Sequence, residues 1–330
     1  MGKQELMRGM TVLVTGGAGF IGSHLCDAII DHGGNVVCLD NFLTGFRKNI
    51  EHLLDNPNFK LIEGDIREIE VCRNAMKNCT HVCHQAALGS VPRSVADPLT
   101  SNNINISGTL NIYFSAFEEG IKRVVFASSS SCYGDEPTLP KVEHKIGKPL
   151  SPYAITKVCD ELYASVFQSL YEMEMIGLRY FNVFGPRQDP DGMYAAVIPR
   201  FVKSLIKGES PQIYGDGEQS RDFTYIENVI QMNIKALTTE SKEATGINYN
   251  VACGMRITVN ELFNNLRKHL TEMNSNIADI EPEYIAPRPG DIPHSLANIE
   301  LAKNNLGYNP EIMPSLGISK AINWYWENLQ

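Results

Sequence analysis

The chain has 330 residues, of which 43% are hydrophobic and 20% are charged, and this composition is typical of a globular protein. Its formal net charge of −9 argues against non-specific nucleic-acid binding, which normally needs a basic face. No apolar run approaches the roughly 20 residues that span a bilayer, and the first ten residues lack the apolar core of a signal peptide. We therefore expect a cytoplasmic protein that binds neither nucleic acid nor membrane.

Eight cysteines are spread along the chain, and in a cytoplasmic protein of this length we expect reduced thiols. Residues 79–84 (CTHVCH) contain two cysteines and two histidines, a composition that could suggest a metal site. The segment alternates like a strand, however, so that neighbouring side chains point to opposite faces of a sheet. We predict buried thiols and imidazoles there and no metal site.

Short apolar segments predict the strands of a parallel sheet, since they are apolar throughout, as strands buried on both faces are. They lie at residues 10–15, 35–39, 59–63, 81–85 and 123–128. Each is followed by a polar or helical stretch, and strands that alternate with helices imply right-handed crossovers. The predicted fold is a Rossmann-like, doubly wound α/β sheet.

Helical spacing is clear at residues 22–31 and strongest at 101–117 and 152–171. From about Pro186 onward Pro and Gly become frequent and the strand–helix alternation weakens. We predict a dinucleotide-binding domain over residues 1–185 and a smaller C-terminal α/β substrate lobe over residues 186–330. Part of the second half, about residues 222–256, is expected to return to the first sheet.

Residues 15–22 (TGGAGFIG) place glycines at 16, 19 and 22 between a predicted strand and a predicted helix. The first glycine allows the tight turn, the second lets the backbone approach a pyrophosphate, and the third lets helix and strand pack closely. The anion then lies at the positive end of the helix. Asp40, at the end of the next strand, suits the adenosine ribose hydroxyls and would repel a 2′-phosphate, which favours NAD over NADP. Its simpler interpretation is a turn-forming residue.

Tyr153 and Lys157 lie four residues apart and therefore on one face of the helix predicted from Pro152. A nearby cation stabilises a phenolate, the form that a general base needs. Taken alone, such a pair is more often an exposed pair on a helix face. The preceding strand favours a functional pair instead, because it ends in four serines, residues 128–131. Ligands bind at this carboxyl end of the strands in parallel sheets.

Four segments together resemble the extended short-chain dehydrogenases that act on nucleotide sugars. They are TGGAGFIG, the serine strand before YGD, SPYAITK, and LRYFNVFGPR, and the resemblance covers nearly the whole chain. Within this group the sequence is most similar to the UDP-sugar 4-epimerases, especially those that interconvert UDP-N-acetylglucosamine and UDP-N-acetylgalactosamine. Activity on UDP-glucose and UDP-galactose is left open.

The resemblance implies roles for individual residues. It makes Ser129, Tyr153 and Lys157 the catalytic set. The NAD contacts that it implies, Tyr153 and Lys157 included, are Gly16, Gly19, Phe20, Ile21, Gly22, Asp40, Asn41, Asp65, Ile66, Gln85, Ala86, Ala87, Asn105, Tyr180 and Val183. The UDP-sugar contacts, Ser129 and Tyr153 included, are Gly89, Ser90, Ser130, Asn182, Ala196, Val197, Gln212, Tyr214, Arg221, Arg288, Asp291 and Ser295.

Three serines narrow the reaction and the substrate within this resemblance. The related 4,6-dehydratases carry Asp-Glu after the catalytic Ser or Thr, and the decarboxylases carry Ser-Glu, whereas this chain has Ser130 and Ser131. Without a carboxyl group there, elimination lacks its acid–base catalyst, which favours epimerisation. Ser295 stands where epimerases restricted to non-acetylated sugars carry a tyrosine, which leaves space for a 2-acetamido group.

Two alternative functions remain open from the sequence. A UDP-glucuronate or UDP-galacturonate 4-epimerase would share the Ser-Tyr-Lys set but needs a cationic or hydroxyl-rich pocket for the sugar carboxylate. A catalytically silent NAD-binding protein of the same fold would not need all three catalytic residues. The family resemblance also implies a homodimer formed through the helices at residues 101–117 and 152–171, although these apolar faces could equally pack on the chain's own sheet.

Overall fold

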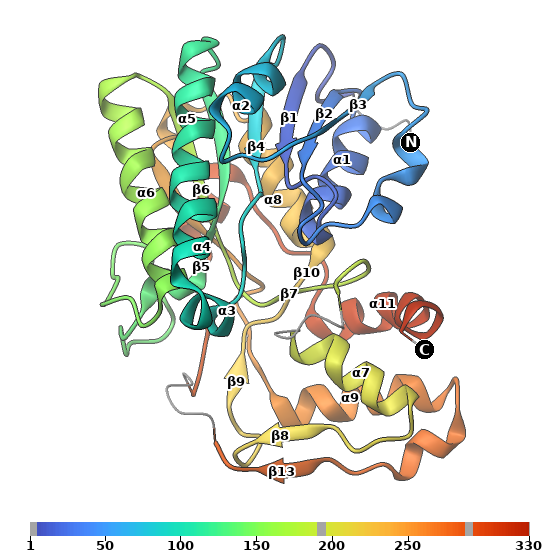
Figure 1. Cartoon of the computed structure of the whole chain (residues 1–330). Helices are drawn as coiled ribbons and strands as arrows, with labels where there is room; N and C mark the ends of the chain where they lie inside the picture. The colour runs from blue at the N-terminus through green and yellow to red at the C-terminus, as the bar shows by residue number, and fades with distance from the viewer. Residues whose placement is uncertain (1–4, 190–195, 288–292, 330) are drawn as a thin grey trace.

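The computed structural model describes residues 5–189, 196–287 and 293–329. Its centre is a sheet of seven parallel strands (Figure 1). The strands are β1 (Thr11–Thr15), β2 (Asn35–Asp40), β3 (Phe59–Glu63), β4 (His81–His84), β5 (Arg123–Ser129), β6 (Glu174–Tyr180) and β11 (Ile247–Val251). Their order across the sheet is β11-β6-β5-β4-β1-β2-β3, so the direction of winding reverses between β1 and β4. In such folds ligands bind at the carboxyl ends of the strands beside this reversal.

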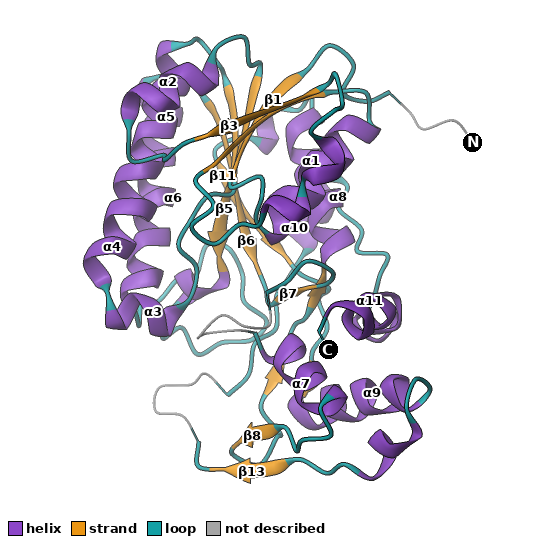
Figure 2. Ribbon diagram, turned by 45° about the vertical axis from the view of Figure 1, so that its right-hand side comes forward, coloured by secondary structure: helices purple, strands orange, loops and turns teal. Residues whose placement is uncertain are grey.

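Helices cover both faces of the sheet (Figure 2). One face carries α1 (Phe20–Asp31), α8 (Ile226–Thr238) and α10 (Glu300–Leu306), and the other carries α2 (Ile69–Met76), α5 (Thr109–Glu118) and α6 (Pro152–Leu170). Two short helices, α3 (Val91–Ala96) and α4 (Pro98–Asn102), follow β4. The strands have apolar side chains on both faces, and these pack into two buried clusters, one under each helical layer. The doubly wound fold is therefore confirmed.

The first five predicted strands agree with the structure to within one residue. The helix predicted over residues 101–117 was wrong as a single element, because α4 and α5 are separated by a π-helical stretch, Asn103–Gly108. This stretch carries the buried side chain of Asn105, which accepts a hydrogen bond from Leu88 N (2.7 Å) and donates one to Leu88 O (3.2 Å). Helical periodicity alone cannot reveal such a widened turn, which occurs most often near functional sites.

A smaller lobe lies beyond the carboxyl end of the sheet (Figure 1). It contains α7 (Val197–Ile206), β8 (Gln212–Tyr214), β9 (Ser220–Arg221), β12 (Ile257–Thr258), α9 (Val259–Thr271) and β13 (Glu283–Ile285). Two further strands, β7 (Val183–Phe184) and β10 (Thr224–Tyr225), pair between sheet and lobe, and α11 (Pro314–Asn328) packs against α9. Between two passes through the lobe, the chain returns to the sheet as α8 and β11. Among the described helices, none is long and apolar enough to cross a membrane.

Candidate active site

The glycine turn after β1 is shaped by close contacts that only glycine allows. Gly16 has a φ of +66°, and a Cβ atom there would lie 2.9 Å from the backbone of Ala86. A Cβ atom on Gly22 would collide with the backbone oxygen of Gly16, so the third glycine lets α1 begin directly beside the turn. The turn therefore presents backbone at the N-terminus of α1, where an anionic group is stabilised.

Asp40 lies at the end of β2 and closes this turn. Its carboxylate accepts hydrogen bonds from the backbone N–H of Ala18 (2.9 Å) and of Phe42 (2.8 Å). Burial raises the pKa of the Asp40 carboxyl, and these two N–H groups oppose the rise. The side chain is thus fixed beside the glycine turn, in the wall of the adjoining cavity.

A cavity of about 730 Å³ runs from the glycine turn along the carboxyl ends of the strands. Most predicted cofactor residues line it: Gly16, Gly19, Phe20, Ile21, Gly22, Asp40, Asn41, Ile66, Gln85, Ala86, Ala87, Tyr153, Lys157, Tyr180 and Val183. Predicted substrate residues at its other end are Gly89, Ser90, Ser129, Asn182 and Ala196. The fold thus brings residues from both predicted groups into one cavity.

This cavity fits a dinucleotide such as NAD. The glycine turn offers the backbone cradle for the pyrophosphate, and Asp40 offers a carboxylate near the turn for ribose hydroxyls. Tyr153 and Lys157 lie in the wall of the same cavity. The residues present therefore match the chemistry of the predicted cofactor.

Helix α6 presents Tyr153 and Lys157 to the cavity from its first two turns. The helix begins at Pro152, and the Ser151 hydroxyl caps it by accepting a hydrogen bond from Ala154 N (3.1 Å). Tyr153 is held through its backbone N–H, which donates to Ser94 Oγ (3.0 Å). Lys157 is buried, and its ammonium donates to the carbonyl oxygen of Ala127 (2.9 Å) on the neighbouring strand β5.

Ser129 is the last residue of β5 and lines the cavity, as the sequence predicts for a serine at a strand end. Its Oγ accepts hydrogen bonds from the Ser131 backbone N–H (3.2 Å) and hydroxyl (2.9 Å). Ser130 starts the short 3₁₀ turn that follows and is not part of the cavity wall. Serine hydroxyls therefore occupy the two positions after Ser129.

Two predicted cofactor residues support the cavity from outside its wall. Asn105 is fully buried, and besides binding Leu88 it donates a hydrogen bond to Thr156 Oγ1 (3.1 Å). The Asp65 carboxylate accepts hydrogen bonds from Arg67 and from Asn41 Nδ2 (2.7 Å), and the Arg67 bonds hold the pKa of Asp65 down at about 2. Asn105 therefore holds the loop after β4, and Asp65 holds the loop after β3.

Gln85 and Tyr180 both line the cavity, and their side chains contact each other there. The Tyr180 hydroxyl donates to Gln85 Oε1 (3.0 Å), and Asn233 on α8 donates to the same hydroxyl (2.9 Å). Sequence reasoning missed Asn233, which is 148 residues from Gln85 in the chain and belongs to no recognised motif. It also missed pocket-lining residues in the loop after β2, including Phe42, and Arg93 on α3.

Three predicted substrate residues of the second half lie directly before β7 (Asn182), on β9 (Arg221) and in the segment before α10 (Ser295), and of these three Asn182 alone lines the cavity. Asn182 donates to the backbone oxygen of Asp222 (3.1 Å), and Arg221 donates to the backbone oxygen of Pro293 (3.1 Å). Ser295 is tied to the same strand through its backbone N–H, which donates to Ser220 O (2.9 Å). Arg288 and Asp291 lie outside the described residues, and Val197 begins α7 without lining a described cavity.

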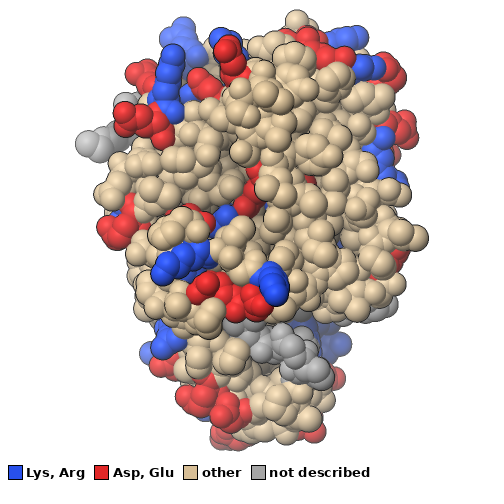
Figure 3. Space-filling view, turned by 90° about the vertical axis from the view of Figure 1, so that its left-hand side faces the viewer, with Lys and Arg blue, Asp and Glu red and all other residues tan. Residues whose placement is uncertain are grey.

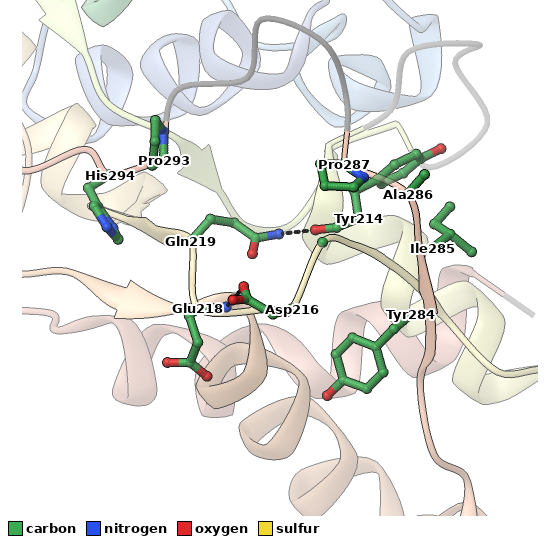
Figure 4. A pocket seen from close by; sticks show the side chains of 11 residues that line it. Tyr214, Asp216, Glu218, Gln219, Tyr284, Ile285, Ala286, Pro287, Pro293 and His294 are labelled. Atoms are coloured by element: carbon green, nitrogen blue, oxygen red, sulfur yellow. Dashed lines mark hydrogen bonds between the residues drawn. The ribbon is translucent and has the colours of Figure 1, made fainter.

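A second cavity of about 720 Å³ lies in the C-terminal lobe at the carboxyl ends of the paired strands β8 and β13 (Figure 4). Tyr214 lines it, together with the acidic side chains of Asp216 and Glu218. Gln219 donates a hydrogen bond to the backbone oxygen of Tyr214 (2.7 Å) across this cavity. Gln212 is exposed and instead donates to Glu283 (3.2 Å).

No group of three or more His, Cys, Asp or Glu side chains in the described parts of the chain could hold a metal ion. The eight cysteines are unpaired thiols. His84, in the segment that could have suggested a metal site, is buried between the hydroxyls of Thr15 (2.6 Å) and Thr109 (2.9 Å). Burial lowers its pKa to about 3, so the imidazole is neutral and ties β1 to α5.

Comparison with known proteins identifies the family. The model of the NAD dependent epimerase/dehydratase family matches residues 12–252. The chain belongs to this family. Membership confirms both the predicted resemblance and the predicted cofactor, NAD.

Several members of the family are similar over almost the whole chain. A putative UDP-glucose 4-epimerase of Methanocaldococcus jannaschii is 38% identical over 96% of this chain and 99% of its own. A solved UDP-N-acetylglucosamine 4-epimerase from Methanobrevibacter ruminantium, in complex with UDP-N-acetylmuramic acid, is 40% identical, with a TM-score of 0.89 over 97% of this chain and 99% of that one. A solved UDP-glucuronic acid 4-epimerase from Bacillus cereus is 29% identical, with a TM-score of 0.86 over 96% and 99%.

Proposed function

We propose that this protein is a UDP-sugar 4-epimerase whose preferred substrates are UDP-N-acetylglucosamine and UDP-N-acetylgalactosamine. The observation that carries the proposal is the single cavity lined by the glycine turn, Tyr153, Lys157 and Ser129. The UDP-N-acetylglucosamine 4-epimerase that is 40% identical supports the acetylated substrate. Ser295 supports it too, since the family resemblance places it where epimerases restricted to non-acetylated sugars carry a tyrosine.

The chain's own residues supply proton transfer and orientation. Tyr153 as phenolate takes the proton of the sugar 4-hydroxyl and returns it after the 4-keto sugar has turned over in the cavity. Lys157, held against Ala127, stabilises the phenolate, and Ser129 hydrogen-bonds the reacting oxygen. NAD, when bound, supplies the reversible hydride acceptor, so the reaction needs no net oxidant and no net proton.

The two positions after Ser129 favour epimerisation over elimination. Ser131 binds Ser129 Oγ through both its backbone N–H and its hydroxyl. A dehydratase needs a carboxyl group in this region to remove the 6-hydroxyl, and neither Ser130 nor Ser131 can serve as that acid. The 4-keto sugar therefore has no partner for elimination at these positions and is returned as the epimer.

A uronic-acid substrate is the second candidate, and Arg93 is the observation that favours it. Arg93 lines the cavity on α3, three residues beyond the Ser90 cap, at the end that also contains Tyr153. A guanidinium can bind a sugar carboxylate through two parallel hydrogen bonds. The similarity to the UDP-glucuronic acid 4-epimerase agrees with this alternative.

One assay separates these functions. The purified protein is incubated with UDP-N-acetylglucosamine, UDP-glucose and UDP-glucuronate in separate reactions without added NAD, and the epimers are separated chromatographically. We expect fastest conversion of the acetylated sugar and none by Tyr153→Phe, which keeps NAD bound. Conversion of UDP-glucuronate alone would replace the hexosamine assignment with the uronate one. No conversion of any sugar by protein that contains NAD would favour a silent binding protein.

We also propose that the protein is a homodimer that pairs through α5 and α6. The outer face of α6 exposes Ile155, Leu162, Val166 and Leu170, with Leu162 62% and Leu170 73% exposed. The view onto this side of the molecule shows a broad area with few charged side chains (Figure 3). Apolar patches of this kind mark interaction surfaces. Light scattering after size-exclusion chromatography should give a dimer for the wild type and a monomer for Leu162→Lys/Leu170→Lys, and a monomeric wild type would refute the proposal.

A further inference from the structure

Asp160 lies one helical turn after Lys157 on α6, inside the molecule. Both side chains are almost completely buried, with 1% of Asp160 and 2% of Lys157 exposed. The Lys157 ammonium donates a hydrogen bond to Asp160 Oδ2 (3.1 Å) and another to Ala127 O (2.9 Å). Since an ammonium has three protons, two of them are bound on the protein side. One remains for the cavity that Lys157 lines.

The surroundings of Asp160 contain no second cation among its described contacts. Its other oxygen, Oδ1, is buried and accepts no hydrogen bond from the residues that the structure describes. On the same helix, Glu161 is already paired with Arg179 by two hydrogen bonds (2.8 and 2.7 Å). Lys157 is therefore the ionic partner of Asp160.

The groups that face the pair from α5, β4 and the turn after β5 are neutral. On α5, burial raises the pKa of Tyr113 well above its usual value, and in the turn after β5 burial raises the pKa of the Cys132 thiol to about 12. On β4, burial holds the pKa of His84 at about 3. The charge balance beside Tyr153 is thus set by Lys157 and Asp160, with the Glu161–Arg179 pair behind them.

Each member of the pair favours the charged form of the other. Burial acts to lower the pKa of Lys157, but the attractions of Asp160 and Tyr153 together outweigh it and the pKa is raised. Burial raises the pKa of Asp160, and the attraction and hydrogen bond of Lys157 oppose that rise. A buried ion pair of this kind is often no more stabilising than apolar residues of the same volume. Its presence at the catalytic lysine suggests a reason other than stability.

We propose that Asp160 is a positioning residue for the epimerase reaction: it holds the Lys157 ammonium against Ala127 and limits the positive charge that Lys157 presents to Tyr153. The inference rests on the proposed function, in which Tyr153 is the base and Lys157 its partner. In an epimerase Tyr153 must both remove a proton and return the same proton. A fully uncompensated ammonium would favour the phenolate so strongly that return of the proton would slow.

The test compares Asp160→Asn with the wild type. Asparagine keeps an oxygen for Lys157 and removes the negative charge, so Tyr153 experiences more of the lysine charge. We expect the acid limb of kcat/KM for the UDP-sugar to move about one pH unit lower, with bound NAD retained and KM changed less than about threefold. An unchanged acid limb in folded, NAD-containing Asp160→Asn would overturn the charge-balancing role.

Asp160→Glu tests the positioning role and remains informative if the asparagine variant does not fold. Glutamate keeps the charge but displaces the carboxylate by one methylene group, so kcat should fall about tenfold while the acid limb stays in place. Full activity of Asp160→Glu would overturn the positioning role. In a Lys157→Met background, Asp160→Asn should have no further effect on the acid limb, because its influence acts through the lysine.

Failure of this inference can be told apart from failure of the proposed function. The wild-type assay alone reports whether the protein is an epimerase. The effect of the Asp160 charge on Tyr153 can be measured without turnover from the phenolate absorbance of Tyr153. This absorbance is the difference between a protein and its matched Tyr153→Phe variant. Its titration midpoint should move lower in Asp160→Asn, and an identical midpoint would reject the charge-balancing role in active and inactive protein alike.

Discussion

On the sheet side of the cavity the wall consists of strand ends and helix starts that are bound to one another by buried side chains. His84 joins β1 to α5 through Thr15 and Thr109, and Lys157 joins α6 to β5 through Ala127. On the side of the C-terminal lobe, Asn182 lines the cavity directly before β7, while Arg221 on β9 and Ser295 in the segment before α10 lie outside the cavity lining. Asn182 donates to the backbone oxygen of Asp222, and Arg221 donates to those of Ser220 and Pro293.

This difference shows how the two walls divide the work. The sheet-side wall is fixed by the parallel topology of the strands that carry it. The lobe-side wall depends on a few ties, chiefly the buried Asp222 carboxylate, which accepts hydrogen bonds from the backbone N–H groups of Cys253 (2.9 Å), Gly254 (3.1 Å) and Ala297 (3.3 Å). A wall built this way can change residues at little cost to the fold, which suits the choice of sugar. Substitutions on the sheet side should therefore abolish binding or turnover, and those on the lobe side should alter substrate affinity or preference.

Gly22→Val should have the largest effect, because its side chain would collide with the Gly16 backbone and push α1 away from the turn. We expect the purified protein to lose nearly all bound NAD, as measured by the NAD released on denaturation. It should also lose all epimerase activity. Gly208→Ala is the control, since Gly208 has a φ of +74° in open space at the end of α7. It should cost about 1 kcal/mol of stability and leave NAD content unchanged. Normal NAD content in Gly22→Val would contradict the tight-packing argument.

Ser129→Ala should lower kcat about 100-fold, since one hydrogen bond to the reacting oxygen is lost where charge develops. KM and NAD content should stay close to wild type. Ser131→Ala is the matched control, because Ser131 only donates to Ser129 and its loss should cost less than about fivefold. Equal losses in the two variants would show that Ser129 acts through the loop and not at the substrate.

Most of the sheet-side wall could be predicted from the sequence because its signals are local. The glycine turn, the serine strand end and the Tyr153–Lys157 spacing each occupy one continuous segment, and the parallel topology then brings the segments together. The bounds of the first five strands followed from apolar runs for the same reason. The widened turn before α5 could not be predicted, since it is set by the contact of Asn105 with a loop distant in the chain.

Asp160, Arg93 and Asn233 could not be predicted, because no sequence motif distinguishes them from ordinary residues of the same type. Asp160 has the same i,i+3 spacing to a lysine as the exposed Glu300–Lys303 pair, and only the fold shows that the former is buried. In the sequence, Arg93 cannot be distinguished from any other charged residue on a short helix. Only the fold shows that it lines the cavity. Asn233 reaches Gln85 only because α8 returns to the sheet after the first pass through the lobe.

On the lobe side, Arg221→Met should raise KM for the UDP-sugar about 10- to 30-fold and leave kcat almost unchanged. A charge-assisted hydrogen bond to a diphosphate contributes about 1.5–3 kcal/mol, and it binds ground state and transition state alike. Methionine keeps much of the side chain's length. Arg267→Met is the control, since Arg267 on α9 binds Glu281 (2.6 Å) and lines neither cavity, so its loss should leave KM unchanged. A fall in kcat of Arg221→Met without a change in KM would place Arg221 with the catalytic residues.

Ser295→Tyr should have the smallest and most selective effect. The backbone N–H of Ser295 donates a hydrogen bond to Ser220 O. A larger side chain at this position therefore leaves that bond in place. If the serine leaves space for the acetamido group, tyrosine should lower kcat/KM for UDP-N-acetylglucosamine about tenfold relative to UDP-glucose, the scale of discrimination expected from pocket size. The ratio of the two kcat/KM values is the measurement, because it cancels general damage to the loop. Ser295→Ala, which keeps the space, should leave the ratio as in the wild type. Equal losses on both sugars in Ser295→Tyr would mean that the residue supports the loop and that acetyl preference is decided elsewhere in the cavity.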